Sequence, residues 1–77
     1  MPSYQATAVK AGDGRTEMLA SHEFEARDTP AARDAADAWA KSASVTSLGS
    51  TAIRLFAGKV LICERALSGG EWEERRP

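Results

Sequence analysis

The stretch RDTPAARDAADAWAKSA, residues 27–43, decides the fold because it carries a helical pattern between two strand-like regions. Asp28, Thr29 and Pro30 form a helix start, since a side-chain oxygen can accept from the first free N–H groups and proline loses no hydrogen bond there. The pattern predicts a helix over 30–43 whose apolar face is almost all small: Ala32, Ala35, Ala36, Trp39 and Ala43. Alanine lets a helix approach a sheet closely, and Trp39 is the expected structural anchor between them.

Two strand-like runs, residues 3–10 and 16–26, precede this helix. In the second run, one face is predicted to carry Met18, Ala20, His22, Phe24 and Ala26. The intervening AGDGR, residues 11–15, is rich in turn formers and predicts an antiparallel hairpin. We expect Lys10 to lie opposite Thr16, because this register puts the apolar residues of both strands on the same face of the sheet. Phe24 is the second expected structural anchor.

The segment after the helix, AIRLFAGKVLICERAL (52–67), predicts a second hairpin folded at Ala57 and Gly58. With a two-residue loop, Phe56 faces Lys59, and one face of the hairpin carries Ile53, Leu55, Val60 and Ile62. The other face is then also apolar, with charges among its members: Ala52, Arg54, Phe56, Leu61, Cys63 and Arg65. A strand pair that is apolar on both faces is usually covered on both.

These elements predict an α+β fold of order ββαββ, in which a four-stranded, largely antiparallel sheet carries one helix packed on one face. The domain is expected to span 1–67. Residues 68–77, SGGEWEERRP, are expected to form a flexible C-terminal tail because of their glycines, mixed charge and terminal proline. The sequence leaves the strand order open, and any parallel pairing across the helix should be right-handed.

The composition points to a small domain with a thin core. The chain has 77 residues, and fifteen of its apolar positions are alanine, which removes little area from water when buried. Cys63 is the single cysteine, so no disulfide within the chain can add to the stability that the thin core supplies. Small domains of this kind are often stabilised by self-association, and we expect a homodimer.

Charge and hydropathy exclude several function classes. The net charge is −1, and the basic residues are scattered rather than arranged in a stripe that could follow phosphates, which disfavours nucleic-acid binding. No apolar run approaches the length of a membrane span, and MPSYQATAVK lacks the apolar core of a signal peptide. These features predict a cytoplasmic protein without membrane association. The abundance of alanine and arginine is typical of a bacterial source.

The sequence gives no catalytic, cofactor or metal signature that outweighs a structural explanation. His22 is the single histidine, which excludes a His pair, and Cys63 is expected to behave as a small hydrophobe. The predicted registers place these two side chains on opposite sheet faces, so they do not form a dyad. Glu17, Glu23 and Glu25 could hold a cation with Asp13, but a solvated acidic face explains them better. We therefore expect no metal and no cofactor.

Two resemblances extend this interpretation. A proline amine freed by removal of Met1 resembles the catalytic base of the tautomerase superfamily, which implies an enzyme acting through Pro2. In that superfamily, however, the first strand leads directly into the helix, whereas residues 16–26 intervene here. The segments EFEARDTPAARDAADAW and AIRLFAGKVLICERAL are similar to small bacterial proteins in which a strand ending in Phe-x-Ala precedes an Ala-rich helix and a final hairpin. This second resemblance implies a fold and no activity.

The preferred hypothesis is a small non-enzymatic interaction or regulatory module acting as a homodimer, with a further protein partner as an option. Its expected interface comprises Phe56, Leu61, Cys63 and Arg54, because one helix can cover one face of the sheet only. One alternative is a small tautomerase-like enzyme that uses the Pro2 amine. A second is weak nucleic-acid contact through a sheet face carrying Arg54, Lys59 and Arg65.

Overall fold

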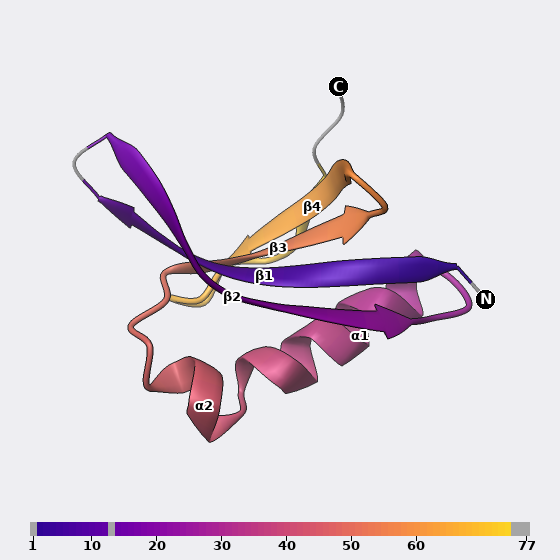
Figure 1. The fold of residues 1–77 in the computed structure, drawn as a ribbon, viewed down its shortest axis with the longest axis horizontal. Helices are drawn as coiled ribbons and strands as arrows, with labels where there is room; N and C mark the ends of the chain where they lie inside the picture. Colours follow the sequence, from indigo (N-terminus) through magenta and orange to yellow (C-terminus); the bar gives the residue numbers. More distant parts are fainter. Residues whose placement is uncertain (1, 13, 75–77) are drawn as a thin grey trace.

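The computed structural model describes residues 2–12 and 14–74, which form one antiparallel sheet with helices on one side (Figure 1). The elements are, in chain order, β1 (Ser3–Gly12), β2 (Arg15–Glu25), α1 (Thr29–Ala40), α2 (Ala43–Thr46), β3 (Ala52–Ala57), β4 (Val60–Ala66) and β5 (Glu73–Glu74). The strand order in the sheet is β2-β1-β3-β4-β5. The α+β class is confirmed, but the sheet has a fifth strand and a short second helix follows α1.

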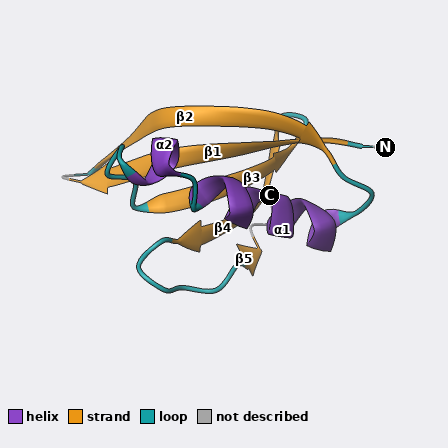
Figure 2. Cartoon of the chain, turned by 90° about the horizontal axis from the view of Figure 1, so that it is seen from below, coloured by secondary structure: helices purple, strands orange, loops and turns teal. Residues whose placement is uncertain are grey.

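Strand β1 lies between β2 and β3 and is antiparallel to both. Strands β2 and β3 therefore run in the same direction, and the two helices connect them by crossing one face of the sheet (Figure 2). The β1–β2 hairpin extends beyond the other strands (Figure 1), because β3 pairs with β1 only from Tyr4 to Val9.

The first hairpin forms where it is predicted, but its register differs. Ala11 lies opposite Thr16, and the pairing shifts between Ala8 and Val9, so that Leu19 is an extra residue in β2. Such a β-bulge reverses the alternation of side chains along one strand. Met18 consequently lies on the sheet face opposite His22, whereas the sequence placed both on one face.

The second hairpin also contains a bulge. Its turn consists of Gly58 and Lys59, with Gly58 at a φ of 62°, a left-handed conformation that favours glycine. The expected turn at Ala57 and Gly58 is therefore wrong by one residue, and Phe56 pairs with Leu61 instead of Lys59. The register shifts after Leu55, which pairs with Cys63 and leaves Ile62 as the extra residue. The expectation that Cys63 and Arg65 share a face with Phe56 is therefore wrong. They lie with Leu55 on the side of the helices.

Helix α1 begins as predicted and ends earlier. The Asp28 side chain accepts a hydrogen bond from the backbone N–H of Ala31 at 2.9 Å, and the buried residues of the helix are Ala32, Ala36 and Ala40. Ala35 is exposed, so its expected place on the buried face is wrong. The side chain of Ala43 lies outside what the structure describes.

The core lies between the alanine face of α1 and the sheet. Its largest fully buried side chains are Ile53, Leu55 and Cys63, and Tyr4, Ala6 and Ala8 of β1 complete the floor under the helix. Val45 of α2 closes one end. Much of this core is alanine, from α1 and from β1, and these small side chains allow the close approach of α1 to the sheet.

The segment expected to be a flexible tail instead packs against the domain as far as Glu74. Glu73 and Glu74 pair with β4, and Trp72 Nε1 donates a hydrogen bond to Asp37 Oδ2 at 3.2 Å. Asp37 also accepts from Arg65 Nη1 at 2.5 Å, so one carboxylate of α1 holds both β4 and the C-terminal segment. Residues 75–77 of the expected tail lie outside the described residues.

Candidate interaction surface

The two faces of the sheet differ in what covers them. One face packs against α1, and no described element covers the other (Figures 1 and 2). Strand pairing places the side chains of this second face, which we call the open face: Ser3, Gln5, Thr7, Val9, Ala11, Thr16, Met18, Ser21, Glu23, Glu25, Ala52, Arg54, Phe56, Leu61, Glu64 and Ala66. This face mixes aromatic and aliphatic side chains with both signs of charge.

A groove runs along the centre of the open face. Its volume is about 380 Å³, and its lining includes Phe56, Arg54, Met18 and Lys59. Thr7 and Val9 form its floor and are only 4% and 3% exposed, because the longer side chains around them shield them from water. Met18, in contrast, is 66% exposed. The groove is thus a shallow apolar channel bordered by flexible side chains.

The open face carries one ion pair between neighbouring strands. Arg54 Nε donates to Glu64 Oε2 at 2.7 Å across β3 and β4. Beside it, Phe56 and Leu61 lie directly opposite one another on the same two strands, and both are half-buried. Cross-strand neighbours on one face contact each other. Arg54, Phe56 and Leu61 therefore form one continuous patch.

Of the four expected interface residues, the structure brings these three together and separates Cys63 from them. Cys63 is 1% exposed and lies under α1. Burial raises the pKa of its thiol, and the nearby Arg33 lowers it to a smaller extent. A thiol that is buried and protonated packs as a small apolar group. Cys63 thus contributes to the core beneath α1 and is absent from the open face.

His22 lies on the helix side of the sheet in an aromatic stack. Its ring is 5.8 Å from that of Phe24 and 5.8 Å from that of Trp39, measured between centroids. The two expected anchors therefore meet at the β2 edge, and Trp39 is half-buried there rather than central. Cys63 lies on the same face as His22, so the expectation of opposite faces is wrong, but it is three strands away, about 14 Å at the usual strand spacing. This distance excludes a dyad between them.

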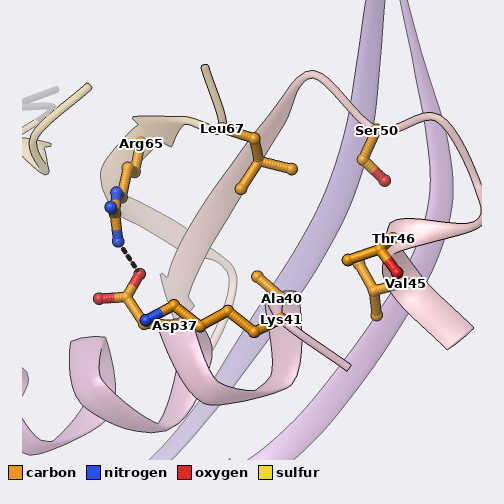
Figure 3. Close-up of a pocket in the computed structure, with 8 residues that line it drawn as sticks. All are labelled: Asp37, Ala40, Lys41, Val45, Thr46, Ser50, Arg65 and Leu67. Atoms are coloured by element: carbon orange, nitrogen blue, oxygen red, sulfur yellow. Dashed lines mark hydrogen bonds and ion pairs between the residues drawn. The ribbon is translucent and has the colours of Figure 1, made fainter. Parts of the chain in front are cut away.

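A second hollow lies on the helix side, between α1, α2 and the end of β4 (Figure 3). Its volume is about 300 Å³, and Ala40, Val45 and Leu67 supply its apolar wall. The Asp37–Arg65 pair forms one side, and these charged groups already satisfy each other. The Ser50 hydroxyl has no hydrogen-bond partner, but it is inaccessible to water and hence to a ligand. This hollow offers few free polar groups for recognition.

The alternative sites of the sequence analysis are not assembled. Arg54 and Lys59 line the open-face groove, whereas Arg65 lies on the helix side in its pair with Asp37. Pro2 is exposed at the end of the sheet, lines neither hollow, and its carbonyl accepts from the N–H of Ala26 at 3.2 Å. Arg54, Lys59 and Arg65 therefore do not form one cationic face.

The structure also separates the acidic side chains considered as cation ligands. The bulge at Leu19 places Glu17 on the face opposite Glu23 and Glu25, and Asp13 lies outside the described residues. Within residues 2–12 and 14–74, no three His, Cys, Asp or Glu side chains gather closely enough to hold a metal ion. No described helix has the length and apolar character needed to cross a membrane.

Sequence reasoning missed several groove residues: Gln5, Thr7, Val9, Thr16 and Met18. The alternation of β1 placed Gln5, Thr7 and Val9 opposite Tyr4, Ala6 and Ala8, and this signal could have located them. No comparable signal exists for Met18, since its face depends on the bulge.

Comparisons of the chain with known protein families, curated proteins and solved structures found no match.

Proposed function

We propose that this protein is a small non-enzymatic interaction module that acts as a homodimer through the open face of its sheet. The observation that carries the proposal is that helices cover one face only, while Phe56, Leu61 and Met18 remain on the other. Apolar side chains gathered on one uncovered face mark interaction surfaces in soluble domains. A second copy presents the same surface, so a two-fold interface needs no further partner.

The small size of the domain supports the same proposal. Four strands at about 4.8 Å spacing and about six residues at 3.3 Å give an open face of about 400 Å² in plan. An interface of this area lies at the small end of specific protein contacts, and we expect a dissociation constant in the micromolar range. Dimerisation would complete the thin core by supplying a second layer over the sheet.

Sedimentation equilibrium from about 1 to 500 µM tests the proposal, a range chosen to bracket micromolar association. The expected result is a mass that rises from one chain to two. Leu61→Glu should remain a single chain over the whole range, because it places a charge in the centre of the apolar patch. Its circular dichroism spectrum should match that of the unmodified protein, since Leu61 is only half-buried.

Leu48→Glu is the matched control. It makes the same substitution at an exposed leucine that follows α2, away from the open face, and should dimerise like the unmodified protein. A mass of one chain for the unmodified protein at 500 µM would contradict the proposal. Equal dimerisation of the Leu61→Glu variant would place the interface elsewhere and would contradict it as well.

A further inference from the structure

The C-terminal segment, residues 71–74, binds to the domain at a site between α1 and β4, which we call the α1–β4 site (Figure 2). The two residues of β5 pair with β4. Trp72 packs against the core, and its Nε1 donates to Asp37 Oδ2 at 3.2 Å. Glu74 Oε1 lies 3.7 Å from Arg33 Nη2. None of these contacts requires that the segment belong to the same chain as the site.

The connection between β4 and this segment, residues 67–70, is a tight turn whose first three residues are exposed. The turn is closed by the N–H of Gly70, which donates to the carbonyl of Ala66 at 3.1 Å, and Arg65 Nε donates to the carbonyl of Gly70 at 2.9 Å. Gly69 has a φ of 116°, a conformation that side chains disfavour. Extension of residues 67–70 therefore breaks two hydrogen bonds and relieves one unusual backbone conformation.

The register of β4 with β5 continues toward this turn. Cys63 lies opposite Glu74, and the direction is antiparallel. Two residues further along each strand, Arg65 and Trp72 lie on the same side of the sheet as this pair, because both donate to the same carboxylate of α1. The alternation of side chains is thus regular on both sides of the turn.

Two copies with extended turns can keep this register between chains. Leu67 then lies opposite Gly70 of the second copy, and Ser68 lies opposite its Gly69. A two-fold axis passes between these two pairs, and residues 63–74 of both copies form one antiparallel ribbon without a gap or bulge. The newly paired residues carry no charge, so the ribbon adds no like-charged pair to those of the closed form.

We propose that residues 67–70 are a hinge and that two copies exchange their C-terminal segments, each inserting Trp72 and Glu74 into the α1–β4 site of the other. The exchange goes beyond the proposed function, because it uses the β4 edge of the sheet instead of the open face. Exchange of identical elements costs little, since the same contacts form in both states. The short hinge keeps the segment at an effective concentration of about millimolar, so the closed form prevails at lower protein concentrations.

A substitution that disfavours the closed turn tests the exchange. Gly69→Val places a β-branched side chain at a φ of 116°, where it is strained, whereas an extended strand accepts valine readily. This strain should favour extension by about tenfold per hinge. Each dimer opens two hinges, so the association constant should rise by about a hundredfold and dimers should form at about ten micromolar.

Sedimentation equilibrium from about 1 to 500 µM measures the exchange, a range that brackets the expected association. Every variant also carries Leu61→Glu, which removes association through the open face. Gly69→Val should then reach the mass of two chains. Gly69→Ala adds only a methyl group at the same position and should shift the mass in the same direction, which provides a second test should the valine variant fold poorly.

Ser68→Val is the matched control. It introduces the same side chain at the neighbouring exposed hinge residue, which already carries a side chain in the closed turn, and it should remain a single chain. Addition of Trp72→Ala to the Gly69→Val variant should return the mass to one chain, because the exchanged segment loses its anchor in the α1–β4 site.

A single-chain mass for both Gly69 variants, with circular dichroism spectra of a folded protein, would overturn the exchange. Equal dimerisation of Ser68→Val, or a dimer that persists after Trp72→Ala, would overturn it as well, because the association would then depend on neither the hinge nor the segment. These outcomes are independent of the proposed function, since all of these variants carry Leu61→Glu. An unmodified protein that stays monomeric would overturn the proposed function alone.

Discussion

The Cys63 thiol lies between the sheet and α1, and burial there raises its pKa above the ordinary value for a thiol. The folded protein therefore holds this proton more tightly than the unfolded chain. The resulting stability is fully present below the unfolded pKa of about 8.5 and is lost as the pH rises through the folded pKa. We expect the free energy of unfolding to fall as the pH is raised above about 8.5.

Urea denaturation at pH 7, 8.5 and 9.5 in the presence of a reductant, chosen to span the thiol titration near about pH 8.5, measures this effect. Cys63→Ala should be less stable at neutral pH, since it leaves a small cavity, but should lose less stability as the pH rises. The difference between the two pH profiles isolates the contribution of the thiol, because every other group is the same in both proteins. Parallel pH profiles would show that Cys63 does not ionise in the accessible range.

The alanine face of α1 sets the distance between helix and sheet. Ala36 is fully buried against the sheet, whereas Ala35, one residue earlier, is exposed. Ala36→Leu adds volume where no space exists and should lower the free energy of unfolding by about 1 to 3 kcal/mol. Ala35→Leu makes the same change toward solvent and should stay within about 0.5 kcal/mol of the unmodified protein.

Urea denaturation followed by tryptophan fluorescence compares these two variants. Trp39 belongs to this helix and stacks on His22 of β2, so its emission should also shift when Ala36→Leu displaces α1. Equal stability of the two variants would mean that the helix adjusts without cost, and it would contradict a close-packed alanine face.

The elements that sequence reasoning predicted correctly depend on neighbours in the chain. Both hairpins and the helix start follow from alternation, from Gly58 and from the Asp28 cap, which are local features, although the pairing beside each turn is shifted by one residue from the prediction. The two bulges have no comparable local signal, yet each reverses the faces of the residues beyond it. For this reason Phe56, Leu61 and Arg54 were predicted on the open face correctly, whereas Cys63 was placed there wrongly.

Strand β5 escaped prediction for a different physical reason. Two residues cannot show alternation, and their position depends on contacts from distant parts of the chain. Trp72 Nε1 donates a hydrogen bond to Asp37 of α1. Arg65 Nη1 donates to the same carboxylate, and Arg65 Nε donates to the carbonyl of Gly70. The composition of 68–77 indicated mobility, because it is rich in glycine and charge. Contacts between residues 28 to 35 positions apart outweigh that local tendency.

The whole domain combines a thin core with one uncovered sheet face, and this combination links its stability to its association. A chain of 77 residues buries a modest fraction of its surface, and much of its core is alanine. A second copy that binds only the folded state stabilises it by mass action. We therefore expect the melting temperature to rise with protein concentration.

Calorimetry or circular dichroism at about 5 and 500 µM measures this shift, since these concentrations lie on either side of the micromolar dissociation constant expected for so small an interface. A hundredfold increase across that range stabilises the folded state by up to about 2.7 kcal/mol, which raises the melting temperature of a domain of this size by up to about 10 to 20 °C. Leu61→Glu removes the association and should melt at one temperature at both concentrations. Leu48→Glu should behave like the unmodified protein, because it leaves the open face intact. A melting temperature that is independent of concentration in all three proteins would contradict the prediction that association stabilises this fold.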